Sequence, residues 1–65
     1  MSYAKLRGAI REKFGTQAAF ANALGMREAT LSSRLNGGTQ WTRDEMQAVG
    51  VLLGIPPEDI HLYFF

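Results

Sequence analysis

Apolar residues recur along most of the chain at steps of three and four, the spacing of a helix with one buried face. The stripe is plainest near the start, where Leu6, Ile10 and Phe14 are each separated by four residues. Applied throughout, this spacing predicts five helices, over residues 2–14, 17–24, 28–36, 43–53 and 57–62. No segment alternates strictly between apolar and polar positions, as a half-buried strand would. The sequence therefore predicts an all-α fold, a compact five-helix bundle with short connections.

Residues that start and stop helices stand at the predicted boundaries. Ser2 and Thr16 are suitable N-caps for the first two helices. Thr42, with Glu45 three residues later, has the pattern of a capping box. Gly25 follows the second helix, where a left-handed residue commonly ends a helix. We therefore expect short helices with well-defined ends.

Composition narrows the classes of function. A chain of 65 residues is expected to be one domain, over residues 1–65, too small to enclose a deep active site. It has no cysteine, and its single histidine, His61, lies in a different predicted helix from Ser32 and Ser33. Without a paired acid, base or metal-ligand set, we expect no enzyme, no cofactor, no metal and no small-molecule substrate.

Hydropathy and charge bear on location and partners. There is no signal-peptide pattern, and the longest mostly apolar stretch, residues 48–57, is too short to span a bilayer, so we expect a cytoplasmic protein. Net charge is only +1, but it is unevenly distributed. Residues 1–37 carry six basic and two acidic side chains, whereas residues 38–65 carry one basic and four acidic side chains. The basic half can face phosphates, although an ordinary mixed surface explains the same distribution.

The second and third predicted helices are joined by a short turn containing glycine, the unit that places a helix in the major groove. Ala21 is small enough for the two helices to approach closely, and Gly25 allows the sharp turn. The exposed side of the third helix is polar or small. We therefore assign base contacts to Arg27, Glu28, Ala29, Ser32 and Ser33.

This segment resembles the phage repressor and Cro family in several features at once. The second helix begins with a glutamine, Gln17, and has an apolar residue followed by alanine, Phe20-Ala21. The turn has the Leu-Gly-apolar pattern, as Leu24-Gly25-Met26. The third helix has an apolar residue in its middle, Leu31, and ends with Asn36-Gly37. The close match covers about a third of the chain, and the five-helix layout extends it. The resemblance implies a lambda-repressor-like fold with a recognition helix over about residues 27–36.

The resemblance also implies roles for single residues. Glu28, Ala29 and Ser33 match positions that face base edges, and Gln17 and Asn36 match positions that contact the DNA backbone. Chemistry and position add further candidates for phosphate contact: Arg34, Thr39, Gln40 and Arg43.

Two residues of the third helix depart from the family pattern. Arg27 stands where the family often has a capping serine or threonine, so this helix is expected to start loosely. Arg34 stands at an often apolar position, and Leu35 is expected to take over its core contact.

The aromatic residues outside this segment have two interpretations. Trp41 is interpreted as a hydrophobic staple or a lid over the core rather than as a base-stacking surface. The end of the chain, Tyr63, Phe64 and Phe65, either folds back onto the core or forms a homodimer interface.

Two hypotheses of function follow. The first is a Cro-like transcriptional regulator that binds a pseudo-palindromic double-stranded DNA operator as a dimer, in a bacterial or phage-infected cell and associated with the nucleoid. The second is a protein–protein interaction module on the same helical fold, docking a partner through its apolar tail in an antitoxin or anti-repressor role. Modest net charge and the acidic Glu28 favour the second slightly.

Overall fold

The computed structural model describes residues 3–65. Most of these residues lie in helices joined by short connections, and no strand occurs among them. The elements are α1 (Ala4–Phe14), α2 (Gln17–Leu24), α3 (Glu28–Leu35), α4 (Arg43–Leu53), the 3₁₀ turn η1 (Pro57–Asp59) and α5 (Ile60–Phe64). The predicted all-α fold of five short helices is confirmed.

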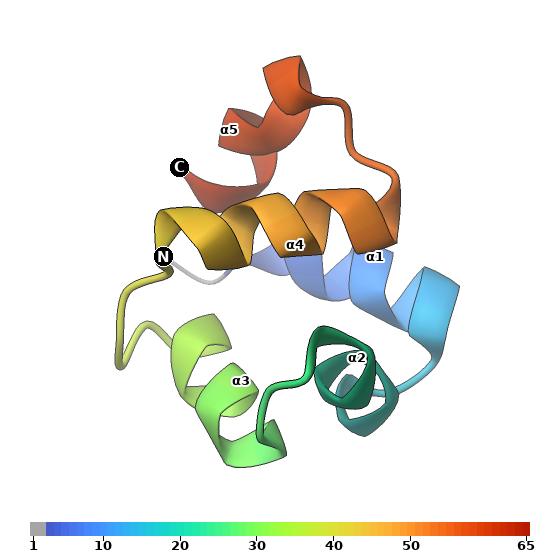
Figure 1. Cartoon of the computed structure of the whole chain (residues 1–65), viewed down its shortest axis with the longest axis vertical. Helices are drawn as coiled ribbons and strands as arrows, with labels where there is room; N and C mark the ends of the chain where they lie inside the picture. Colours follow the sequence, from blue (N-terminus) through green and yellow to red (C-terminus); the bar gives the residue numbers. More distant parts are fainter. Residues whose placement is uncertain (1–2) are drawn as a thin grey trace.

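The helices surround one core, with α4 crossing the middle of the molecule (Figure 1). Helices α2 and α3 lie on one side of α4, and η1 with α5 lies on the other. Helix α1 contacts α2, α4 and α5, so it joins the two sides. Side chains from all five helices fill the centre, and those that are fully buried are Leu6, Ile10, Phe20, Leu31, Leu35 and Val49.

Three of the predicted helix boundaries are present with their capping contacts. The Thr16 hydroxyl accepts a hydrogen bond from the Ala19 amide at 3.1 Å. Thr42 and Glu45 form a complete capping box, in which each side chain accepts from the other residue's amide. Gly25 ends α2 in the left-handed region, at φ 73°. Local sequence therefore determines where α2 and α4 begin and where α2 ends.

The first helix begins later than predicted, at Ala4, and its N-cap position is held by Tyr3. Ser2, the predicted cap, lies outside the described residues. Tyr3 is left-handed, at φ 53°, which is unusual for a residue with a side chain. Its ring packs edge-on against Trp41, with the ring centroids 6.5 Å apart. This tertiary contact holds the Tyr3 side chain against the core.

Two other predicted boundaries also need correction. Helix α3 ends at Leu35 rather than at Asn36, because the chain turns away through Gly37 in the left-handed region. The last helix was predicted over residues 57–62, but η1 comes first and α5 then runs from Ile60 to Phe64. The added turn carries Phe64 into the core, where its ring meets Trp41 edge-on at a centroid distance of 5.2 Å.

The aromatic end of the chain is divided between the core and the surface. Phe64 is buried, Tyr63 is half-buried beneath the Lys5 ammonium, and Phe65 is 75% exposed. Within this chain Phe64 therefore serves the core, and Phe65 is the aromatic side chain available to a partner. Trp41 is also buried, as its interpretation as a lid over the core requires.

Within residues 3–65, none of the helices is both long enough and apolar enough to cross a bilayer.

Candidate nucleic-acid and partner interface

Helices α2 and α3 are joined by three residues that include a sharp turn. The Gly25 amide donates to the Asn22 carbonyl at 3.1 Å, and the Met26 amide donates to the Ala21 carbonyl at 2.9 Å. These two bonds satisfy carbonyls at the end of α2 that would otherwise lack partners. The turn therefore fixes the direction in which α3 leaves α2.

The two helices pack closely because their facing residues are small or apolar. Ala21 of α2 and Leu31 of α3 are both buried in the core cluster, together with Phe20 and Leu35. A larger residue than Ala21 would force the surrounding helices apart. The sequence-based expectation of a close α2–α3 pair agrees with this packing.

The outer side of α3 divides the predicted base-contact residues into two groups. Arg27, Glu28 and Ala29 are exposed at the start of the helix. Ser32 and Ser33 are half-buried near its end, and the Ser33 hydroxyl lies 3.4 Å from the Thr39 hydroxyl. The first turn of α3 is thus the part that is open to another molecule.

The C-terminal end of α3 is held by two arginines. Arg34 donates two hydrogen bonds to the carboxylate of Glu45, each 2.9 Å long. Arg7 donates to the Leu35 carbonyl at 2.8 Å and to the Asn36 side-chain oxygen at 2.7 Å. These contacts attach the end of α3 to α4 and α1.

The ion pair changes the titration of both partners. The hydrogen bonds from Arg34 hold the pKa of Glu45 below its ordinary value, although partial burial acts in the opposite direction. The same hydrogen bonds raise the pKa of Arg34. Sequence analysis assigned Arg34 to phosphate contact, and in the structure its guanidinium already has partners within the chain. No local sequence pattern distinguishes these two uses of an arginine.

The N-terminal end of α3 has no comparable support. Arg27 occupies the N-cap position, and its side chain makes no capping hydrogen bond. The missing cap is the one expected from the absence of serine or threonine here, and the loose start inferred from it stays a prediction.

The remaining predicted phosphate contacts are spread over the surface. Gln17 is half-buried and lines a small cleft at the start of α2. Thr39 is exposed and lies beside Ser33 and Arg34. Gln40 and Arg43 line apolar clefts that Phe65 also lines, so the structure does not bring them together with the start of α3.

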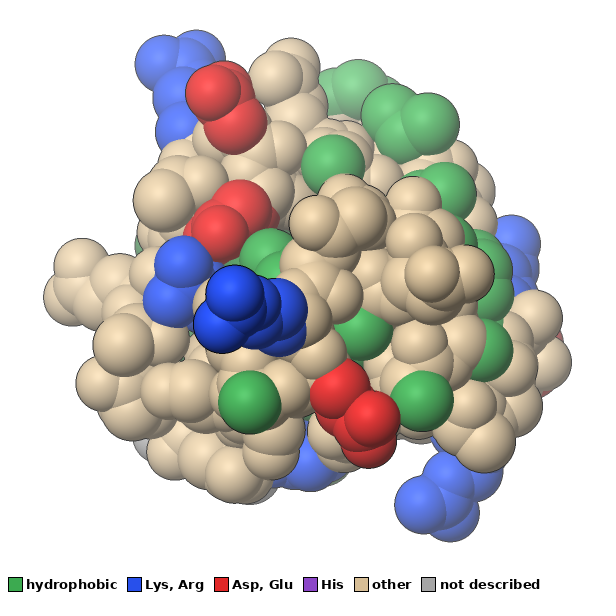
Figure 2. Space-filling view, turned by 60° about the horizontal axis from the view of Figure 1, so that its bottom comes forward, with side chains coloured by type: hydrophobic (Ala, Val, Ile, Leu, Met, Phe, Trp, Pro, Cys, Tyr) green, Lys and Arg blue, Asp and Glu red, His purple; other side chains and the backbone are tan. Residues whose placement is uncertain are grey.

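The side of the molecule that carries α2 and α3 has mixed charge. Figure 2 brings this side forward and shows basic and acidic side chains interspersed, with small apolar groups between them. A protein that depends mainly on phosphate contacts usually presents a clustered basic surface. The surface charge therefore gives only modest support for tight electrostatic binding of DNA.

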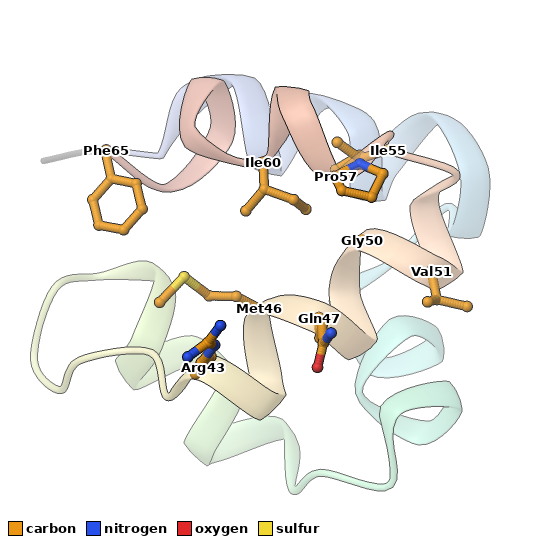
Figure 3. A pocket seen from close by; sticks show the side chains of 9 residues that line it. All are labelled: Arg43, Met46, Gln47, Gly50, Val51, Ile55, Pro57, Ile60 and Phe65. Carbon is orange, nitrogen blue, oxygen red and sulfur yellow. The ribbon is translucent and has the colours of Figure 1, made fainter.

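A second open surface lies between α4 and the segment formed by η1 and α5. It is a groove of about 530 Å³ with an apolar lining that includes Met46, Val51, Ile55, Ile60 and Phe65, and Figure 3 labels all its lining residues. We call it the α4–α5 groove. Sequence analysis identified only one of these residues, Phe65, as a surface for a partner. The groove depends on how two helices distant from α3 meet, which helical spacing does not reveal.

Comparison with known proteins identifies a family and a structural counterpart. The model of a family described as "Protein of unknown function (DUF739)" matches residues 1–65, and this description names neither a repressor nor a Cro protein. No curated protein matches the chain significantly. Among solved structures, the modulator of repression of the temperate bacteriophage TP901-1 from Lactococcus lactis matches with a TM-score of 0.88 and 44% identity, over 98% of this chain and 86% of that chain. That counterpart is named for a regulatory role in its bacteriophage.

Proposed function

Because the chain belongs to the DUF739 family, we propose that it has the role named for its structural counterpart and modulates phage repression. The observation that carries this proposal is the combination of 44% identity with a TM-score of 0.88 over almost the whole chain. Fold similarity alone would not transfer a function, since small helical folds serve many. Agreement in both sequence and shape along the full length gives much stronger support.

We propose further that it acts by contacting a protein partner of the repression system, the repressor itself. Two observations support a protein partner over direct reading of DNA. The α2–α3 side has mixed charge, and its Arg34 is engaged by Glu45. The α4–α5 groove exposes apolar side chains, among them Phe65 and Val51, of the kind that protein interfaces cover.

The experiment uses the repressor and operator of the phage genome that encodes this chain. Fluorescence anisotropy of labelled operator would be measured with this chain alone, with the repressor alone, and with both. If the chain acts on the repressor, it changes the repressor's apparent affinity for the operator at least tenfold while binding the operator weakly by itself. An unchanged repressor–operator affinity at saturating chain would contradict the proposal.

A second candidate function is sequence-specific DNA binding by α3, in the manner of a Cro-like repressor. It is favoured by the close α2–α3 pair, which leaves Arg27, Glu28 and Ala29 exposed at the tip of α3. In this case the chain binds a pseudo-palindromic operator as a homodimer, with half-sites about 34–36 Å apart. A nucleoid-associated location in the bacterial cytoplasm belongs to this candidate.

Selection of bound duplexes from a random pool at two salt concentrations tests DNA binding by this chain. Sequence-selective binding that weakens steeply with salt would support the second candidate. Glu28→Ala would then change the preferred bases, because a carboxylate in the groove accepts from cytosine. Glu12→Ala, which removes an exposed carboxylate from α1, is the matched control and should leave the preference unchanged. Failure to enrich any sequence at low salt would exclude this candidate.

A further inference from the structure

The α4–α5 groove adjoins a second apolar cleft of about 360 Å³. This cleft is lined by Trp41 and Phe64 among others, and the two hollows share Met46 and Phe65. Figure 3 shows the Phe65 ring across from the Met46 side chain, at one end of the groove. Together they form one elongated apolar depression that runs beside α4.

Trp41, which lines the second cleft, has an unpaired polar atom. The residue is 8% exposed, and its indole nitrogen has no hydrogen-bond partner among residues 3–65. Buried polar groups in folded proteins nearly always have a partner, so an unpaired donor requires an explanation. The nitrogen is covered by neighbouring side chains, so a ligand's oxygen acceptor satisfies it only when binding moves those side chains aside.

The walls of the groove also expose large apolar side chains. Val51 is 81% exposed and Phe65 is 75% exposed, and both line the groove. Apolar anchors at the rim of an elongated groove are the features that receive an amphipathic helix. The shape and lining of the groove therefore favour a helix with apolar residues at steps of three and four.

The charge of the surrounding elements indicates the sign of the partner. Helix α4, η1 and α5 carry Asp44, Glu58 and Asp59 as acidic residues besides Glu45. Glu58 and Asp59 stand in sequence between the lining residues Pro57 and Ile60, and the basic Arg43, which itself lines the groove, opposes them only in part. Within residues 3–65, the ion pair present is the one that Glu45 makes with Arg34, so the other three carboxylates are not neutralised by such a contact. A helix with basic residues beside its apolar stripe would complement them.

A second copy of this chain fits the groove less well. A two-fold dimer through this surface would bring the same acidic elements of both copies together, and like charges at an interface are unfavourable. A contact between the basic half of one copy and the groove of the next would be head-to-tail, which generally extends into open chains. The charges therefore favour a different protein.

We propose that the depression formed by the α4–α5 groove and the Trp41 cleft binds an amphipathic helix of a partner protein. The helix carries lysine or arginine beside an apolar stripe. It also places an oxygen acceptor on the Trp41 indole, either a side-chain oxygen or a free carbonyl of its last turn. This inference rests on the proposed function only in assuming a protein partner, and it specifies where that partner binds.

A library of helical peptides, displayed and selected on the whole chain, tests the proposal. Enriched peptides should share an apolar stripe flanked by Lys or Arg, and exchanging those basic residues for Glu should weaken binding at least tenfold. Trp41 is the only tryptophan, so its fluorescence reports binding directly. The NMR signal of its indole proton should move downfield when the acceptor binds. Absence of enrichment, enrichment of acidic peptides or an unshifted indole signal would overturn the proposal.

Variants at exposed positions assign the binding site without threatening the fold. Phe65→Ala and Val51→Lys should each weaken binding of the selected peptide at least tenfold, the second because it adds a positive charge beside the basic residues of the peptide. Leu62→Ala is the matched control, because Leu62 is 49% exposed and does not line the groove. Equal effects of Phe65→Ala and Leu62→Ala would place the peptide elsewhere and overturn the proposal.

Two further measurements separate the remaining outcomes. Dimerisation of the chain alone, abolished by Phe65→Ala in analytical ultracentrifugation, would show a second copy in the groove and overturn the proposal. The same variants in the repressor–operator assay distinguish the two proposals. A chain that still changes operator affinity after Phe65→Ala and Val51→Lys would keep the proposed function and refute the groove as its site.

Discussion

The guanidinium of Arg34 and the carboxylate of Glu45 face each other in parallel, with two hydrogen bonds of 2.9 Å joining the last turn of α3 to the first turn of α4. Glu45 also accepts from the Thr42 amide at 2.8 Å. One carboxylate therefore both starts α4 and positions α3 relative to it. This arrangement links the stability of the fold to the ionisation of a single group.

We expect Glu45 to make the fold less stable in acid. Its pKa is lowered in the folded state, chiefly by the hydrogen bonds from Arg34, from an ordinary value of 4.5. Its contribution to stability is therefore complete above that ordinary value and is lost as pH falls through the folded pKa. Urea denaturation from pH 7 to pH 3 would measure the loss.

Glu45→Gln is the matching variant, because glutamine also suits a capping box but carries no charge. At pH 7 we expect it to lower the free energy of unfolding by about 1 kcal/mol, with a smaller dependence on acid pH than in the original chain. If the free energy of unfolding of Glu45→Gln falls with acid as much as that of the original chain, carboxylates other than Glu45 cause the acid dependence.

Gly25→Ala should destabilise the fold by about 1–2 kcal/mol, because alanine is strained at φ 73°. The added methyl group would meet nothing within 4 Å, so backbone strain is the whole cause. Gly8→Ala is the control at an equally open position inside α1, and there we expect a gain of about 0.5–1 kcal/mol. Urea denaturation measures both variants. If Gly25→Ala and Gly8→Ala changed the free energy of unfolding in the same direction, this account would be contradicted.

Phe64→Ala should cost about 3–5 kcal/mol, because it removes a buried ring from its contact with Trp41. In a chain of this size that loss leaves much of the protein unfolded, so Phe64→Leu provides a milder variant whose midpoint can be measured. Phe65→Ala, at the exposed neighbouring position, should change stability by less than about 0.5 kcal/mol. Thermal unfolding followed by circular dichroism compares the three, and similar losses at both positions would contradict the assigned roles.

Gly50→Ala should disturb the contact between α4 and α5. A methyl group at Gly50 would lie 2.6 Å from the terminal carbon of Ile60. Because this carbon is the movable end of a half-buried side chain, we expect a cost at the lower end for overpacking, about 1 kcal/mol. Ile60→Val removes that terminal carbon, so the double variant should recover most of the loss caused by the alanine. A double-mutant cycle measures this coupling, and additive effects would show that the two residues do not interact.

The sequence predicts local features of the fold well, because their causes lie within a few residues. Thr16 caps a helix that starts at the next residue, and Gly25 ends that helix through bonds to carbonyls three and four residues before it. Helical spacing likewise identifies Leu6 and Ile10 as core residues. These interactions require no knowledge of the rest of the chain.

Contacts between distant segments were not predictable in this way. Arg7 reaches Leu35 and Asn36 across 28 and 29 residues, and nothing around any of the three residues indicates the pairing. Val51 belongs to a groove only because α5 folds back along α4. The sequence thus predicts the candidate helix α3 and the exposed residues of its first turn, but Ser32 and Ser33, expected on the exposed side, are half-buried. It predicts neither the anchoring of the end of α3 nor the second surface. The predicted base and phosphate contacts remain predictions.

The unequal support of α3 has a consequence for how it meets another molecule. Its final turn is fixed through Arg7 and Arg34, whereas its first turn at Arg27 lacks a side-chain cap. Thermal fluctuations should consequently grow along the helix toward Glu28, with faster amide hydrogen exchange there. The end of α3 that is most accessible can adjust its backbone to a bound surface while the hydrophobic centre of the protein keeps its packing.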